Sequence, residues 1–126
     1  MKNDMIKTEI DVKNNKIGII RINNIDYISL TDLARYKNAD DPSDVIKKWL
    51  SNYDTIEFLG LWEELSNENF NSAEFSRIKR EAPRKSFTMT PSRWCTEVNA
   101  IGMTYGKGKY SVGTFAHPDI PFEFAS

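Results

Sequence analysis

Lysine and glycine alternate at one point of the chain, in a combination suited to a phosphate backbone. Gly106-Lys107-Gly108-Lys109 separates two segments rich in β-branched and aromatic residues, 103–105 and 110–116, so we expect it to form the tip of a β-hairpin. Glycine lets the backbone approach a phosphate closely, and each lysine neutralises phosphate charge. The same four residues would also make an ordinary soluble turn. Three neighbours join this candidate surface, and the first can stack or pack on a sugar: Tyr110, Ser111 and Thr114.

A second candidate surface lies on a helix that we expect to begin after Asp41. Asp41 is a capping residue and Pro42 suits the first helical position. The apolar stripe of this helix is Val45, Ile46, Trp49 and Leu50. The outer face then carries lysines suited to phosphate groups and short polar residues that can reach base edges, namely Ser43, Lys47, Lys48, Ser51 and Asn52. Because lysine pairs are common on solvated helices, this face predicts a nucleic-acid contact only together with the hairpin.

Motifs for catalysis are incomplete. The segment 102–109 departs from the phosphate-binding loop G-x-x-x-x-G-K-[ST], because its glycine spacing is one residue short and Gly108 stands where Ser or Thr is required. Asp119 and Glu123 are typical of a metal-dependent nuclease, but Ala125 stands where a lysine is expected. We therefore expect no catalytic residue, no enzyme activity, no cofactor and no small-molecule substrate. A metal-dependent nuclease is the weaker alternative.

The chain contains one cysteine, Cys95, and one histidine, His117. No intrachain disulfide can form, and these two residues cannot make a Cys₂His₂ or Cys₄ zinc site. A reducing, intracellular compartment fits this best. The first residues lack the apolar region of a signal peptide, and no run approaches the ~18 apolar residues of a membrane span. We expect a soluble, cytoplasmic protein in which Cys95 is a small buried residue and His117 a capping or hydrogen-bonding one.

Charge is segregated along the chain although the net charge is only −1. Residues 38–76 hold two Lys and nine Asp or Glu, a net of −7, whereas residues 77–110 hold eight Lys or Arg and two Glu, a net of +6. A basic half that folds to one side attracts phosphate even in a slightly acidic protein. The plainer interpretation is that these charges alternate along solvated faces.

The 126 residues are 40% hydrophobic, enough for a single folded domain of the α+β class. β-branched residues alternate in the first part, which predicts an antiparallel meander of strands at Ile6–Val12, Ile17–Ile22 and Asp26–Ser29. Asn14-Asn15 and Asn23-Asn24 mark the two turns. We expect this meander to be structural.

Five to six helices are predicted after the meander. A short helix from Ser29 to about Tyr36 is followed, after Lys37–Asp40, by the helix that Asp41 caps, which makes a helix–turn–helix pair. Asp54 and Glu57 form a capping box for a helix over Thr55–Leu65, on which Glu63 and Glu64 should be solvated, and Asn71 and Glu74 repeat the box for Ser72–Ala82. Thr90-Pro91 begins a fifth helix, with Trp94, Val98 and Ile101 on one face and Gly102 at its end.

The last predicted helix covers Asp119–Ala125, and Pro121 should disturb its interior. A helix of barely two turns is marginal without tertiary packing. We therefore expect the parent protein to continue beyond Ser126.

The chain resembles the KilA-N domain of phages, large DNA viruses and bacterial genomes. The likeness runs from about Gly18 to the end, and it rests on matching blocks that occur in the same order. These blocks are Tyr27–Ala34, Ile46–Leu50, Thr55–Glu63, Asn99–Met103, and Gly108–Tyr110 followed by Gly113–His117.

This resemblance implies a DNA-binding module related to the fungal APSES domain, with a winged-helix-like α+β fold. By position, the DNA-contacting helix corresponds to Pro42–Asn52 and the wing to Gly106–Thr114. Lys109 replaces the family's usual arginine and lacks its bidentate fork, and one extra residue precedes Gly113. The resemblance thus implies binding of double-stranded DNA, sequence-tolerant or specific, in a prophage-derived or bacterial protein that regulates transcription.

A protein-interaction module of the anti-repressor type remains the main alternative. Its candidate surface is the polar, acidic segment Glu63–Glu74. The sequence specifies neither the DNA target nor the oligomeric state.

Overall fold

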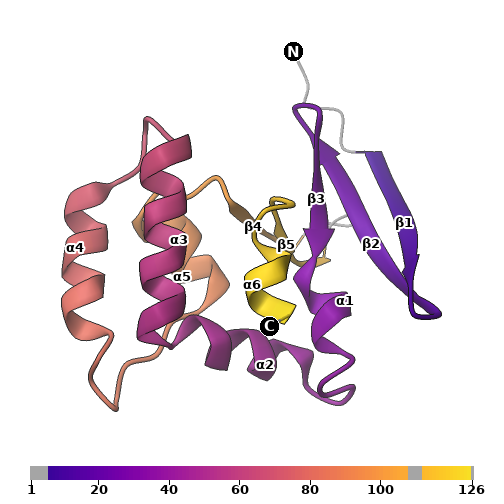
Figure 1. Cartoon of the computed structure of the whole chain (residues 1–126), viewed down its shortest axis with the longest axis horizontal. Helices are drawn as coiled ribbons and strands as arrows, with labels where there is room; N and C mark the ends of the chain where they lie inside the picture. Colours follow the sequence, from indigo (N-terminus) through magenta and orange to yellow (C-terminus); the bar gives the residue numbers. More distant parts are fainter. Residues whose placement is uncertain (1–5, 108–111, 126) are drawn as a thin grey trace.

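Five strands form one antiparallel sheet in the computed structural model, which describes residues 6–107 and 112–125. The strand order is β1-β2-β3-β5-β4 (Figure 1). The bounds are β1 Ile6–Val12, β2 Asn15–Ile22, β3 Ile25–Ser29, β4 Met103–Lys107 and β5 Val112–Ala116. Because β5 pairs with β3, the late hairpin joins the early meander across most of the sequence. This pairing fixes the hairpin relative to the helices that follow β3.

Both turns of the meander have the backbone conformation that asparagine favours. Asn23 and Asn24 have φ of 52° and 67°, as a two-residue type I′ turn requires. The first turn lies at Lys13 and Asn14, with φ of 50° and 68°. The predicted position, Asn14-Asn15, is wrong by one residue, because Asn15 pairs with Val12 as the first residue of β2.

Six helices lie among the described residues, which confirms the predicted α+β class. Their bounds are α1 Leu30–Ala34, α2 Pro42–Leu50, α3 Tyr53–Ser66, α4 Ser72–Glu81, α5 Pro91–Glu97 and α6 Pro121–Ala125. Helices α3 to α5 gather on one side of the molecule, and the β1–β2–β3 meander lies on the other (Figure 1). The main core lies among the helices and the β4–β5 hairpin, with Trp94, Leu50 and Ile56 fully buried, and a smaller cluster of Ile20, Tyr27 and Phe115 packs on the meander. None of these helices is long and apolar enough to cross a membrane.

Local capping signals predict the starts of α2, α4 and α5 correctly, with Thr90 as the cap of α5. Asp41 caps α2 and accepts a hydrogen bond from the Asp44 amide, with Pro42 in the first turn. Asn71 caps α4 and accepts from the Glu74 amide. The predicted cap of α3 is wrong, because Asn52 rather than Asp54 fills that position and accepts from the Asp54 amide.

The end of α5 differs from the prediction. The helix stops at Glu97 with Val98 as its C-cap, and Asn99 takes the left-handed conformation at φ 57°. Gly102 is therefore not the helix terminator. A Cβ there would lie 2.8–2.9 Å from atoms of Ile120, Trp62 and Glu63, so glycine permits a close tertiary approach at this position.

Glu63 is buried, contrary to the predicted solvated position, with only 1% of its surface exposed. Its carboxylate accepts hydrogen bonds from the amides of Ile101 and Gly102 at 3.0 and 2.7 Å, and from the Asn67 side chain at 3.0 Å. A buried charge is costly unless it is hydrogen-bonded in this way. Glu63 thereby attaches the segment between α5 and β4 to helix α3.

The last helix starts at Pro121, two residues later than predicted. Proline is suited to the first helical position, where its missing amide has no partner to lose, so it does not disturb the helix interior. Phe124 of this helix is buried and packs edge-on against Trp49 of α2, with ring centroids 5.0 Å apart.

Candidate nucleic-acid interface

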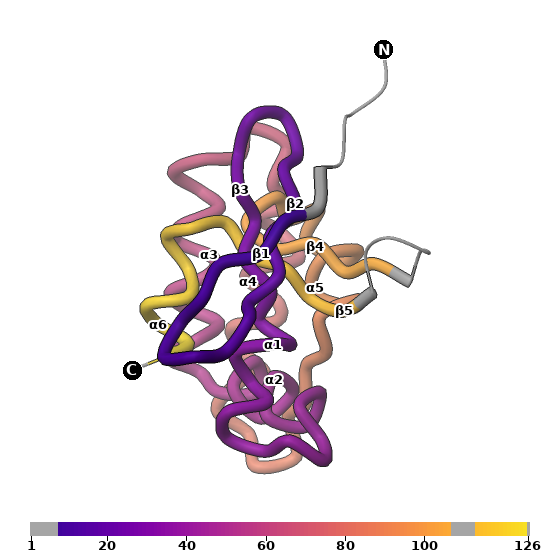
Figure 2. Tube along the Cα trace, turned by 90° about the vertical axis from the view of Figure 1, so that its right-hand side faces the viewer, coloured from indigo at the N-terminus to yellow at the C-terminus, as the bar shows by residue number. Residues whose placement is uncertain are grey.

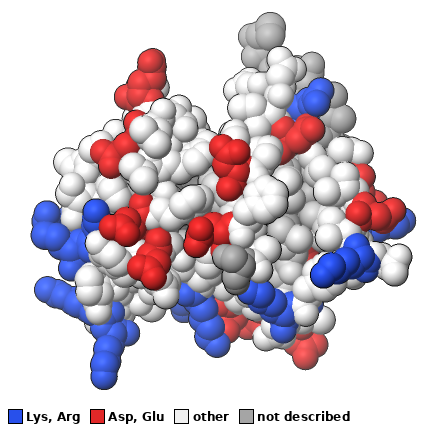
Figure 3. Space-filling view, in the orientation of Figure 1, with Lys and Arg blue, Asp and Glu red and all other residues white. Residues whose placement is uncertain are grey.

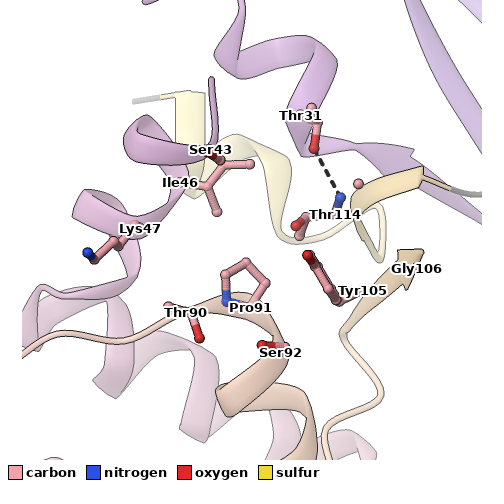
Figure 4. A pocket seen from close by; sticks show the side chains of 11 residues that line it. Thr31, Ser43, Ile46, Lys47, Thr90, Pro91, Ser92, Tyr105, Gly106 and Thr114 are labelled. Atoms are coloured by element: carbon pink, nitrogen blue, oxygen red, sulfur yellow. Dashed lines mark hydrogen bonds between the residues drawn. The ribbon is translucent and has the colours of Figure 1, made fainter. Parts of the chain in front are cut away.

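A groove of about 520 Å³ separates helix α2 from the β4–β5 hairpin (Figure 4). It is bounded by α2, the start of α5, both strands of the hairpin and one residue of α1. The lining residues are Thr31, Ser43, Ile46, Lys47, Thr90, Pro91, Ser92, Tyr105, Gly106, Gly113 and Thr114. The helix and the hairpin singled out in the sequence therefore share one groove.

Helix α2 contributes Ser43 and Lys47 to the groove, with Ile46 buried beneath them. Figure 4 shows the Lys47 side chain extending from α2 away from the hairpin, so its ammonium group lies at the edge of the groove. Lys47 has no ion-pair partner within the part of the chain that the structure describes. Lys48 is outside the lining, and its ammonium group lies 3.0 Å from the Asp44 carboxylate.

The last two predicted residues of this helix have their side chains hydrogen-bonded within the protein. Ser51 is only partly exposed, donates to the Lys47 carbonyl at 2.7 Å and accepts from the Met89 amide at 2.8 Å. Asn52 is exposed but caps α3 through its side-chain oxygen. Neither residue lines the groove.

On the hairpin side, Tyr105 and Gly106 line the groove. Tyr105 is 41% exposed, and its hydroxyl points into the groove (Figure 4). Lys107 ends β4 opposite Val112. The remaining residues predicted for the tip, Gly108, Lys109, Tyr110 and Ser111, lie outside the described residues, as does the side chain of Lys107.

Helix α1 holds the base of the hairpin. The Thr114 amide donates to the Thr31 hydroxyl at 3.0 Å, and Thr114 is 2% exposed, so little of its side chain is free for a ligand. Gly113 has φ of 109°, and a Cβ there would lie 2.7 Å from the Thr31 hydroxyl oxygen. Both observations make Thr31 the contact that sets the hairpin against the helix–turn–helix pair.

Sequence reasoning missed five groove residues: Thr31, Thr90, Pro91, Ser92 and Tyr105. The sequence places Thr31 only within the short helix Ser29–Tyr36 and Thr90 only at the start of the fifth helix. The Thr90 hydroxyl does cap α5, accepting from the Arg93 amide at 3.3 Å. Their tertiary position depends on the pairing of β5 with β3, for which the local sequence carries no signal.

Part of the positive charge in residues 77–110 is neutralised inside the protein. Arg77 pairs with Glu74, Glu81 and Glu97, and Arg93 pairs with Glu97 at 3.0 Å. The hydrogen bond from Arg77 lowers the pKa of the Glu74 carboxyl, and the same bond raises the pKa of Arg77. Glu74, and Glu57 that pairs with Lys79, lie outside residues 77–110, so the net of +6 from the sequence overstates the charge available to a ligand.

Exposed cations nevertheless gather near one edge of the molecule. Figure 3 shows Lys and Arg along the lower edge, where α2 and the connection between α4 and α5 lie, and Asp and Glu over the region of α3. Arg80, Arg84 and Lys85 at the end of α4 and in that connection are exposed. None of the three has an ion pair among the described residues.

Three other side chains with reactive or metal-binding groups, those of Cys95, His117 and Asp119, make contacts within the fold. Burial raises the pKa of Cys95 to about 12, the Glu63 carboxylate adds to this, and the thiol donates to the Met103 carbonyl. Asp119 accepts from the Trp62 indole at 3.1 Å, and its amide donates to His117 at 3.1 Å. No group of three His, Cys, Asp or Glu side chains within residues 6–107 and 112–125 is arranged to hold a metal ion.

Comparison with known proteins gives one family. Neither the curated proteins nor the solved structures gave a match. The family model of the KilA-N domain matches residues 11–126, nearly the whole chain, and confirms the resemblance seen in the sequence blocks. The chain therefore belongs to the KilA-N domain family, a family of DNA-binding domains.

Proposed function

We propose that this domain binds duplex DNA with helix α2 in the major groove and the β4–β5 hairpin against the neighbouring backbone. The observation that supports this is the single groove lined by both elements. The major groove of B-DNA, ~12 Å wide, admits one helix. An element beside that helix then meets the adjacent sugar-phosphate backbone or minor groove.

The proposed roles follow from residue chemistry. Lys47 at the groove edge, with Lys107 and Lys109 in the hairpin, would neutralise phosphates, because a lysine acts as a point charge. Ser43 is exposed on α2 and lines the groove. Its hydroxyl donates to the Asp41 carboxylate at 3.0 Å at the exposed start of the helix, and its oxygen can still accept a hydrogen bond from a base edge. Gly106 allows the backbone to come close to a phosphate.

The five predicted helix residues should contribute unequally to DNA binding. Ser51 and Asn52 already use their side chains to hold Met89 and helix α3, and Lys48 is paired with Asp44. We therefore assign them smaller contributions to binding than Lys47 and Ser43. Lys109 stands where the family usually has arginine and lacks the bidentate fork, which favours a phosphate contact over guanine recognition.

A DNA-binding domain of this family fits a regulatory protein of bacterial or phage origin that works inside the cell. We propose that setting, with binding either sequence-tolerant or specific.

The test is a salt titration of DNA affinity by fluorescence anisotropy. Each phosphate contact contributes ~0.9 to the slope of log K against log salt on duplex DNA. Replacing Lys107 and Lys109 by Gln together, or Lys47 by Gln, should flatten the slope between roughly 50 and 200 mM salt. Lys16→Gln, at an exposed position of β2 outside the groove, is the matched control. Slopes that change no more than in the control would refute the proposed contacts.

A further inference from the structure

A second groove, of about 300 Å³, lies between α3 and α4. It shares no lining residue with the groove beside the hairpin. Apolar side chains form its floor and carboxylates its rim. The lining residues are Asp54, Glu57, Phe58, Leu61, Glu64, Phe75 and Lys79.

The apolar floor is held in place by tight packing between the two helices. Gly60 has no side chain, and a Cβ there would overlap the Phe75 ring, so Phe75 enters the space against α3. Leu61 is left 57% exposed beside it. A large aliphatic side chain beside a fixed aromatic floor offers apolar surface that a partner can bury.

The rim is acidic, and its charge is only partly balanced. The Glu57 carboxylate lies 3.7 Å from the Lys79 ammonium group. Asp54 and Glu64 have no ion pair among the described residues. The groove lining therefore holds three carboxylates and one ammonium group, and this excess of negative charge repels a phosphate backbone and attracts a cationic ligand.

These residues recur along one face of α3. Asp54, Glu57, Phe58, Leu61 and Glu64 follow the i, i+3, i+4, i+7 spacing of a single helix face. A helix laid along that face would meet acidic and apolar side chains at intervals of one turn, ~5.4 Å. The complementary ligand is therefore a helix with an apolar stripe flanked by Lys or Arg.

We propose that the α3–α4 groove docks a cationic amphipathic helix of a partner protein. Leu-type anchors of the partner pack on Leu61 and Phe75, and its cations pair with Glu64 and Asp54. The hairpin and α3 lie toward opposite sides of the molecule (Figure 2), so DNA and this partner can be bound together.

The probe is a synthetic helical peptide with leucines at i, i+3, i+4 and i+7 flanked by lysines. A peptide of the same composition, scrambled to remove the apolar stripe, serves as its control. Titration of the full ¹⁵N-labelled chain in roughly physiological salt should shift amides of α3 and α4. The scrambled peptide should bind weaker by a factor of about ten or more, because the loss of even one apolar anchor lowers affinity about tenfold. Equal binding of both peptides, or shifts centred on α2 and the hairpin, would overturn the proposal.

Two pairs of variants distinguish binding in the α3–α4 groove from nonspecific attraction of a cationic peptide to negative charge. Leu61→Ala should weaken the amphipathic peptide about tenfold, whereas Phe122→Ala, on helix α6, more exposed and outside the lining, should leave it unchanged. Glu64→Gln should weaken binding more than Glu68→Gln. Equal effects within each pair would contradict docking at this groove.

Two further measurements distinguish a partner helix in the α3–α4 groove from a second copy of the chain and from DNA. Sedimentation of the chain alone should show a monomer at every concentration; self-association abolished by Leu61→Ala would place a second copy in the groove and overturn the proposal. DNA affinity should be the same for Leu61→Ala and the unchanged chain. Loss of DNA affinity with Leu61→Ala would show that the groove is not an independent site.

Discussion

Single residues set how closely neighbouring elements pack, through two glycines that have no side chain and one buried carboxylate. Gly60 and Gly102 lie where a Cβ would meet a neighbouring side chain, and Glu63 is a buried carboxylate bound by two backbone amides. None of these roles is visible in the local sequence, because each depends on a partner at least 15 residues away along the chain. Local capping at Asp41 and Asn71 was predictable because the partner is only three residues away.

Gly60→Ala should destabilise the domain although alanine is the better helix former. The propensity gain is about 1 kcal/mol, whereas inserting a Cβ into the Phe75 ring costs about 1–3 kcal/mol of overpacking. Urea unfolding should give a lower free energy of unfolding, and adding Phe75→Leu should recover part of the loss. A more stable Gly60→Ala protein would show that Phe75 moves aside freely.

Cys95 should be almost inert toward thiol reagents in the folded protein. Its pKa of about 12, raised first by burial and then by Glu63, keeps the group protonated at pH 8. The thiolate fraction there is on the order of a thousandfold below that of an ordinary cysteine. Reaction with Ellman's reagent at pH 8 should be slow in buffer and fast in guanidinium chloride. Comparable rates in both would contradict this environment.

At the scale of elements, the sheet positions the candidate interface. Pairing of β5 with β3 brings the hairpin beside α1, and Thr31 fixes its base through the Thr114 amide. The sequence predicted both hairpin strands and the helix–turn–helix pair, because alternation and caps are local signals. The sequence could not predict that the hairpin is hydrogen-bonded to helix α1, since Thr31 and Thr114 are separated by 83 residues.

Thr31→Val should misplace the hairpin without removing a charge. Valine keeps the shape but removes the acceptor, which leaves the Thr114 amide unsatisfied at a cost of about 1–2 kcal/mol. DNA affinity should fall and the salt slope should flatten, because a misplaced hairpin loses the phosphate contacts proposed for Lys107 and Lys109. Thr31→Ser keeps the acceptor and should restore affinity in anisotropy titrations. An equal loss for both variants would show that the hydrogen bond does not position the hairpin.

At the scale of the whole molecule, charge is divided between faces less completely than along the sequence. Arg77 is paired with Glu74 and Lys79 with Glu57, both carboxylates of the acidic stretch 38–76, so the sequence tally overestimates the basic surface. The segment 63–74, predicted as a solvated acidic surface, contains the buried Glu63 and Asn67. Its Glu64 and Glu68 are exposed, and Glu64 lines the α3–α4 groove together with Asp54 and Glu57. Side-chain pairing of this kind depends on tertiary contacts and cannot be counted from composition.

Helix α2 and the β4–β5 hairpin should form one DNA-binding surface. This can be measured by titrating the ¹⁵N-labelled domain with a DNA duplex and mapping the amide chemical-shift changes. We expect the largest shifts at Ser43–Lys47, Tyr105–Lys107 and Gly113–Thr114, around the shared groove. Shifts concentrated on the β1–β2 meander or on the α3–α4 groove, with these residues unmoved, would contradict it.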